Sequence, residues 1–110
     1  MKRIILLGLL LATPAIAHAR LVNSDPAANA KVKSPGQIKL QFSESLEPAF
    51  SSAGLTDAGG KTVPVSKSVG GDTITLLPLT LKPGVYKVTW HSVGQDTQRL
   101  AGSFGFTVIP

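Results

Sequence analysis

Few side chains in the sequence are able to carry metal or acid-base chemistry, and the only two histidines, His18 and His91, come first among them. The chain has no cysteine, and its single methionine is Met1. Disulfides, thiol nucleophiles and thiolate metal sites are therefore excluded, and so is a thioether-rich site for a soft ion such as Cu(I). A metal ion bound by this chain must be held by nitrogen and oxygen atoms.

His18 lies just after a segment, residues 1–17, that has the pattern of a secretory signal peptide. Two basic residues precede an apolar run that begins at Ile4 and breaks before Pro14. The run is shorter than the roughly 20 apolar residues that span a bilayer, so we expect cleavage rather than anchoring. We predict a signal peptide over 1–17 and a mature domain over 18–110 that has no membrane span.

Two cleavage points fit the small-x-small pattern of signal peptidase sites. A cut after Ala17 makes His18 the first residue of the mature chain, whereas a cut after Ala19 removes His18 and leaves Arg20 first. The position of Pro14, where the apolar helix must end, favours the first cut. A terminal His18 is able to chelate one metal ion, because its α-amine and its imidazole both lose protons near neutral pH.

The charge balance gives little support to a nucleic-acid partner. The whole chain has 11 basic and 6 acidic residues, a formal net charge of +5. Cleavage removes Lys2 and Arg3, so nine basic residues remain and the net charge falls to +3. We expect neither a disordered polyelectrolyte nor a nucleic-acid binder, and the length fits a single globular domain.

The elements that must position these residues are β-strands. Polar and apolar residues alternate from Gln37 to Phe42, and strand signals between glycine and proline turns recur without helical periodicity. We predict an all-β, immunoglobulin-like β-sandwich with a core on Phe42, Trp90, Phe104 and Phe106. The pattern gives about seven strands: Leu21-Val22, Ile38–Phe42, Ser51–Thr56, Thr62–Val65, Thr73–Leu77, Val85–Ser92 and Ser103–Val108.

Signatures of catalytic sites are absent from the sequence. Glycine-rich nucleotide motifs and the zinc-protease motif do not occur, and two histidines give a hydrolase triad little support. Glu44 and Glu47 are close in sequence, but nothing supplies a substrate cleft for a carboxylate pair. We therefore expect no enzyme.

Six stretches form a pattern that is specific in combination: His18–Leu21, Ser24–Ala30, Leu40–Ser51, Pro83–Trp90, Asp96-Thr97 and Gly102–Val108. Together they resemble the CopC family of periplasmic copper-resistance proteins. The likeness covers nearly the whole mature chain. It implies an immunoglobulin-like Greek-key β-barrel in the periplasm that holds one Cu(II) ion.

The resemblance also implies a set of copper ligands. In the family, the amine and imidazole of an N-terminal histidine bind the ion together with the aspartate and the histidine of an Asp-x-His motif. His18 matches the first histidine and Asp96 matches the aspartate, but Gln98 stands where the second histidine is expected. An amide oxygen is a poorer donor to Cu(II) than an imidazole, so a weakened or rebuilt site is expected.

Three interpretations of this departure remain open. Gln98 or water completes the site, or His91 replaces the missing imidazole, or metal binding has been lost while the fold survives. Strand alternation disfavours His91, because it follows Trp90 and so points to the opposite, solvent face. By resemblance, Glu44 lies near the copper loop, where it would accept a hydrogen bond from His18.

The leading hypothesis from the sequence is a periplasmic copper carrier or buffer that serves copper resistance or homeostasis. Its expected partners are the copper ion and an inner-membrane transporter of the CopD type. The alternative is a metal-free, immunoglobulin-like interaction module that docks on a membrane transporter. An oxidative copper enzyme is disfavoured, because the sequence has two histidines and no evident substrate surface. Nothing in the sequence indicates the oligomeric state.

Overall fold

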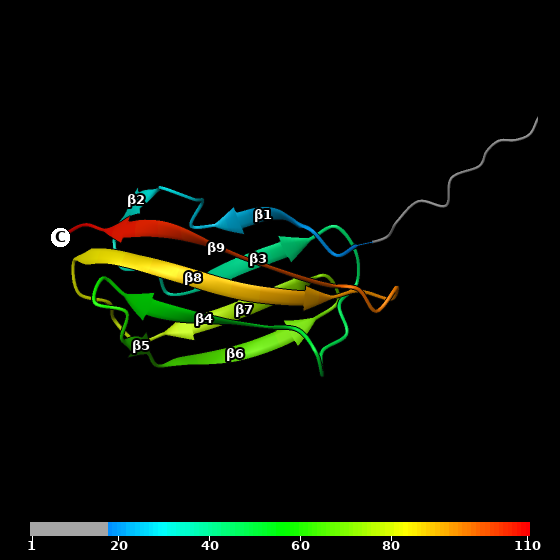
Figure 1. The fold of residues 1–110 in the computed structure, drawn as a ribbon. Helices are drawn as coiled ribbons and strands as arrows, with labels where there is room; N and C mark the ends of the chain where they lie inside the picture. Colours follow the sequence, from blue (N-terminus) through cyan, green and yellow to red (C-terminus); the bar gives the residue numbers. More distant parts are fainter. Residues whose placement is uncertain (1–17) are drawn as a thin grey trace, which may run out of the picture.

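Residues 18–110, the part of the chain that the computed structural model describes, form two β-sheets packed face to face (Figure 1). One sheet has four strands in the order β1-β3-β7-β6, and the other has five in the order β2-β9-β8-β4-β5. The strands are β1 Leu21–Asp25, β2 Lys31–Val32, β3 Ile38–Phe42, β4 Ser52–Asp57, β5 Thr62–Val63, β6 Val65–Gly70, β7 Thr73–Pro78, β8 Gly84–Val93 and β9 Arg99–Val108. Within the described range, no helix is long and apolar enough to cross a membrane.

The predicted all-β class is confirmed, and residues 18–110 form nine strands where the pattern indicated about seven. The stretch Thr62–Val65, predicted as one strand, is interrupted at Pro64, which has no N–H to donate to a ladder. After Pro64 the chain passes to the other sheet as β6. The second additional strand, β2, has two residues and pairs in parallel with the end of β9, so it is too short to show a periodic pattern.

The core forms where the inner faces of the two sheets meet. Alternation in β3 buries Ile38, Leu40 and Phe42, while the residues between them face solvent. The ring of Phe42 meets the ring of Trp90 from the opposite sheet edge-on, with centroids 5.3 Å apart. Phe42 and Phe106 are fully buried, as predicted. Trp90 and Phe104 are partly buried and pack against this core.

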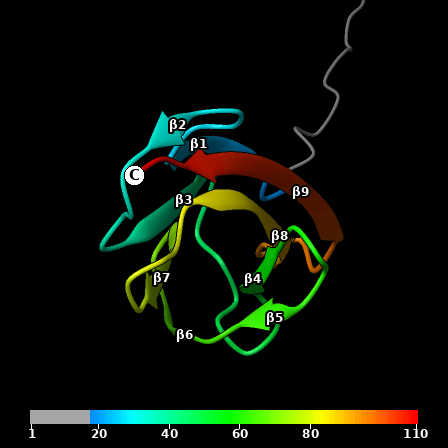
Figure 2. The same ribbon diagram turned by 90° about the vertical axis from the view of Figure 1, so that its left-hand side faces the viewer.

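The two ends of the sandwich are built from different segments (Figure 1). We call one the His18 end; it carries residues 18–20, 43–51, 71–72 and 94–98. The opposite Pro110 end carries the remaining connections and the C-terminus. Figure 2, a view onto the Pro110 end, shows the two sheets curving around the interior of the sandwich. A hydrogen bond from Lys67 Nζ to Ser52 Oγ (2.6 Å) links β6 to β4 of the other sheet.

Candidate metal centre

The structure brings together His18 and Asp96, the two residues that the sequence singled out as metal ligands. Nδ1 of His18 lies 2.8 Å from Oδ2 of Asp96, although the residues are 78 positions apart. Their side chains keep 33% and 22% of their surface exposed, so the pair is accessible to an ion from solvent. It is the only ion pair within residues 18–110.

Two serines hold the backbone that precedes β1. The hydroxyl of Ser43, just after β3, donates to the carbonyl of His18 and accepts from the N–H of Arg20, both at 2.9 Å. The hydroxyl of Ser92 in β8 donates to the carbonyl of Ala19 at 2.6 Å. Both Ala19 and Ser92 are 0% exposed. Three consecutive residues are therefore tied to both sheets, and this fixes where the ring of His18 lies.

Neither serine was predicted from the sequence as part of the site. Ser43 lies within the stretch Leu40–Ser51 that carried the family resemblance, but nothing there distinguishes it from its neighbours. For Ser92 a signal exists. It shares the inward face of β8 with Val88 and Trp90, and a hydroxyl at an inward position needs a hydrogen-bond partner.

Asp96 is held by its own loop between β8 and β9. Its Oδ1 accepts the backbone N–H of Gln98 at 3.0 Å, while Oδ2 faces His18. The N–H of Thr97 donates to the carbonyl of Gly94 at 3.0 Å, and Thr97 adopts φ = 62°. A β-branched residue is rare at positive φ and costs about 1–3 kcal/mol there, so the surrounding contacts must hold this turn.

Gln98 takes part in the site through its backbone, which binds Asp96, while the residue as a whole is exposed. No side-chain hydrogen bond of Gln98 occurs among the described residues. Its amide is therefore not part of a preformed ligand set with His18.

Glu44 packs against Gly94 in the loop that carries Asp96. A Cβ placed on Gly94 would lie 2.7 Å from Oε1 of Glu44 and 3.3 Å from Cβ of Ala19. A side chain at position 94 would therefore displace the carboxylate of Glu44 and press on Ala19. The predicted hydrogen bond from His18 to Glu44 is not among those formed within residues 18–110, and no ion pair joins them there.

His91 points away from the core, as strand alternation predicts. It pairs across the sheet with Ser52 and Ala101, and its side chain lines a surface hollow. Burial is the main cause that lowers the pKa of His91 below its ordinary value, and the charges of Arg99 and Lys67 add to it. His91 makes no hydrogen bond to the His18–Asp96 pair in the described part of the chain.

The donor chemistry of the pair fits a metal ion that accepts nitrogen and oxygen ligands. The hydrogen-bond contact of 2.8 Å between His18 Nδ1 and Asp96 Oδ2 brings both donor atoms to one place on the surface. No group of three or more His, Cys, Asp or Glu residues that could hold a metal occurs within residues 18–110. Further ligands must therefore come from the backbone, other side chains or water.

Fold and site together define a small β-sandwich protein with a pair of nitrogen and oxygen donors at one end. The chain belongs to the CopC family, because the CopC domain profile matches residues 21–109.

Relatives and a solved structure support the same assignment. Protein YobA of Escherichia coli strain K12 is 40% identical over 105 residues, which cover 89% of this chain and 85% of YobA. Copper resistance protein C of Pseudomonas syringae pv. tomato is 36% identical over 111 residues, 92% of this chain and 88% of the relative. The crystal structure of PcoC, a methionine-rich copper resistance protein from Escherichia coli, superposes with a TM-score of 0.79 at 34% identity, covering 84% of this chain and all of PcoC. The predicted family and fold are confirmed.

Proposed function

We propose that the protein is a periplasmic Cu(II)-binding carrier or buffer that serves copper resistance or homeostasis. The observation that carries this proposal is the contact between His18 and Asp96. Copper-resistance relatives that span most of the chain support copper as the metal. PcoC is described as methionine-rich, whereas the sole methionine here is Met1. Bound copper is therefore expected to be cupric.

The proposal requires His18 to be the first residue after export, with residues 1–17 removed as a signal peptide. The packing of Ala19 supports a cut after Ala17. A cut after Ala19 would take a fully buried side chain from the core and leave the buried hydroxyl of Ser92 without its partner. Leaving a buried polar group unpaired costs about 1–3 kcal/mol.

In the proposed site, the α-amine and Nδ1 of His18 close a chelate on the ion, and Asp96 adds a carboxylate oxygen. Water or the amide of Gln98 completes the coordination. The affinity is then lower than with a third imidazole, because amide oxygen and water are weaker donors to Cu(II). His91 gains no support as a replacement ligand, because it bonds to neither His18 nor Asp96 within residues 18–110.

The proposed role is to hold and release copper and involves no reaction on a substrate. An inner-membrane copper transporter of the CopD type is the proposed exchange partner. Protons compete with the ion for its nitrogen and oxygen donors, so affinity should fall as the pH is lowered.

The test begins with the intact mass of the secreted protein, which identifies its first residue. Titration with Cu(II) against a competing chelator then compares the natural protein with His18→Ala. We expect a mature chain that starts at His18 and a large loss of affinity in the variant. A mature chain that starts at Arg20, or an unchanged affinity in His18→Ala, would overturn the proposal.

A second candidate function is a metal-free interaction module, and the observation that favours it is the exposed Gln98 in the loop that holds Asp96. Gln98→His separates the two functions. A copper carrier with a weakened site should gain at least tenfold in Cu(II) affinity, roughly 1.4 kcal/mol. A loop reshaped for a partner should gain little, and the natural protein should then show no specific Cu(II) binding.

A further inference from the structure

An open hollow of about 760 Å³ lies at the His18 end, beside the Asp96 loop. One wall is the segment 47–50, which joins β3 to β4. The other wall comes from the end of β8, the start of β9 and Thr97. Because Thr97 directly follows Asp96, a molecule in this hollow would contact the loop that carries the proposed copper ligand.

The walls of the hollow are held in place, and one aromatic side chain lies mostly in water. The N–H of Glu47 donates to the carbonyl of Val93 at 2.8 Å, which ties the segment to β8. The N–H of Phe50 donates to the carbonyl of Glu47 at 3.0 Å, closing a turn. Phe50 is nevertheless 64% exposed. An aromatic ring held at the rim of a hollow gains free energy if another apolar group covers it.

Positive charge gathers on one side of the same hollow. Arg99 lines it, and Lys67 from β6 reaches its edge, because Lys67 Nζ bonds to Ser52 Oγ and Ser52 pairs across the sheet with His91. Neither cation lies within 4.0 Å of a carboxylate in the described part of the chain, where the only ion pair is His18–Asp96. Glu47 is the single acidic residue in the lining. The charges of Arg99 and Lys67 are therefore available to an acidic partner.

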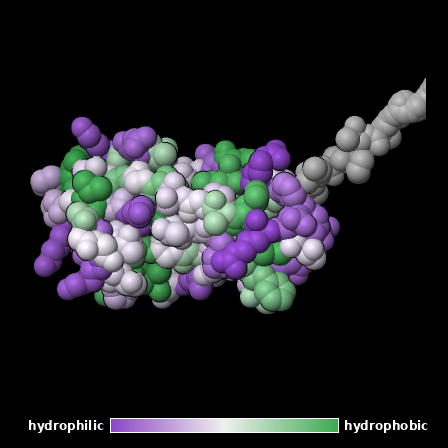
Figure 3. Space-filling model, viewed as in Figure 1, coloured by the Kyte–Doolittle hydropathy of each residue, from purple (hydrophilic) through white to green (hydrophobic). Residues whose placement is uncertain are grey.

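Figure 3 shows hydrophobic and hydrophilic surface side by side at this end. At the lower right of this view, a hydrophobic projection over the segment that leads into β4 adjoins a strongly hydrophilic stripe. Apolar surface next to charged surface is the arrangement expected of a protein docking site, where an apolar anchor is surrounded by charged contacts that set the orientation.

We propose that this hollow docks an acidic segment of a partner protein, with a large apolar side chain against Phe50 and carboxylates facing Arg99 and Lys67. The biological meaning of this surface rests on the proposed function, because the partner would then exchange copper at the neighbouring Asp96 loop. The docking itself needs no metal, since no lining residue is a proposed ligand.

The test uses a probe of defined chemistry on the metal-free protein. An acetylated hexapeptide, with leucine and phenylalanine between two pairs of aspartates, is titrated into the isotopically labelled chain while backbone amide shifts are recorded by NMR. We expect saturable shifts confined to 47–50, 67, 91–93 and 97–99. The Kd should rise at least tenfold in Arg99→Glu and severalfold in Phe50→Ser. Lys82→Glu, an equal charge change at the Pro110 end, should leave the Kd unchanged.

Several results would overturn the docking proposal. These are equal binding of a peptide with lysines in place of the aspartates, equal weakening by Lys82→Glu, binding to anionic vesicles with no response to the acidic peptide, or shifts that arise from dimerisation of the chain. The titration is repeated on Asp96→Asn. If Asp96→Asn still binds the peptide, docking does not depend on the copper site. The docking proposal and the copper proposal can then fail independently.

Discussion

The His18 end and the Pro110 end of the sandwich differ in what their side chains hold. At the His18 end, side-chain hydrogen bonds hold the two segments that carry the proposed metal ligands. Ser43 and Ser92 bind the backbone of residues 18–20, and Asp96 binds both His18 and its own loop. Each of these bonds depends on one particular side chain at one position.

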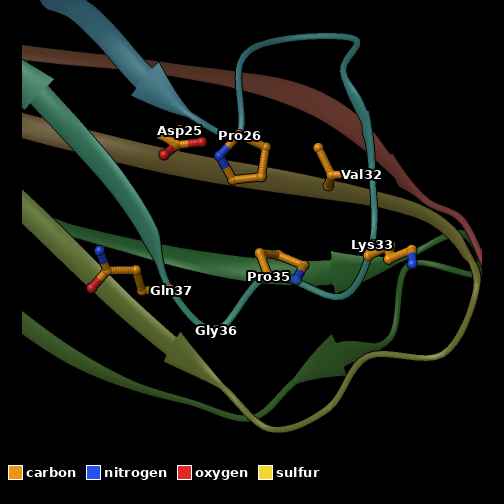
Figure 4. A pocket seen from close by; sticks show the side chains of 7 residues that line it. All are labelled: Asp25, Pro26, Val32, Lys33, Pro35, Gly36 and Gln37. Atoms are coloured by element: carbon orange, nitrogen blue, oxygen red, sulfur yellow. The ribbon is translucent and has the colours of Figure 1, made fainter.

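At the Pro110 end, backbone pairing holds the end of β9, and the side chains of Asp57 and Ser34 hold two connections that carry no proposed ligand. The N–H of Thr107 donates to the carbonyl of Ala30, and the N–H of Ile109 donates to that of Val32, each at 2.8 Å. The hollow at this end lies between the end of β1 and the segment leading into β3 (Figure 4), and its lining is Asp25, Pro26, Val32, Lys33, Pro35, Gly36 and Gln37. The side-chain bonds of Asp57 and Ser34 at this end involve no residue of the proposed metal site.

The difference leads to an experimental expectation. Substitutions at the Pro110 end should alter stability alone, whereas substitutions at the His18 end should also alter metal binding. Matched pairs of variants, one at each end, test this division.

The largest effect is expected for aspartate removal. Asp96→Ala should weaken Cu(II) binding by more than about 100-fold, because even the outer partners of metal ligands contribute about 10–100-fold. Asp25→Ala, at the Pro110 end, should leave the affinity unchanged. Competitive titration with a chromophoric chelator measures both. Equal affinities in the two variants would mean that the His18 end holds no copper site.

Glycine replacement should have the next largest effect. In Gly94→Ala, the new methyl group would displace the carboxylate of Glu44 and press on Ala19. We expect about tenfold weaker Cu(II) binding and a loss of about 1 kcal/mol in the free energy of unfolding. In Gly36→Ala, the added Cβ meets nothing within 4 Å. Neither the Cu(II) affinity nor the free energy of unfolding should fall in this variant. A normal affinity in Gly94→Ala would show that the approach of Glu44 and Ala19 to the loop is irrelevant to the site.

A pair of serine variants separates stability from binding. Ser43→Ala removes the hydroxyl that accepts the N–H of Arg20, and Ser34→Ala removes the hydroxyl that accepts the N–H of Leu81. Each should lower the free energy of unfolding by about 1 kcal/mol in urea denaturation. Only Ser43→Ala should also weaken Cu(II) binding, by roughly threefold to tenfold, and Ser43→Thr should restore it. A normal affinity in Ser43→Ala would exclude a positioning role for Ser43.

The smallest effect concerns His91. Arg99→Gln should raise the pKa of His91, but burial, the larger cause, should keep it below its ordinary value. Because the folded pKa is lowered, the unfolded chain binds the proton more readily, and stability falls as the pH drops below about 6.5. An NMR titration of the imidazole measures the shift. An unchanged or lower pKa would show that Arg99 does not act on this ring.

Strand alternation predicted the fold class and most strands, because burial on one face leaves a period of two in the sequence. It also predicted that His91 faces away from the core. The split at Pro64 and the short strand Lys31–Val32 were not predicted, since the change of sheet and the two-residue pairing depend on tertiary contacts.

The candidate site was less predictable than the fold. Family resemblance indicated His18 and Asp96, and the structure places them in contact. The bonds of Ser43 and the backbone role of Gln98 depend on how distant segments pack. Neither leaves a periodic mark in the sequence.

The long separation between His18 and Asp96 gives copper a second consequence for this chain. An ion held by both would act as a removable cross-link that closes a loop across 78 positions. The unfolded chain does not bring the two residues together, so the ion binds the folded state, and at a free copper concentration about 100 times Kd it adds about 2.7 kcal/mol to stability. The Tm should therefore rise with Cu(II) and fall again when a chelator removes it. Melting temperature would then serve as a measure of how much of the protein is loaded.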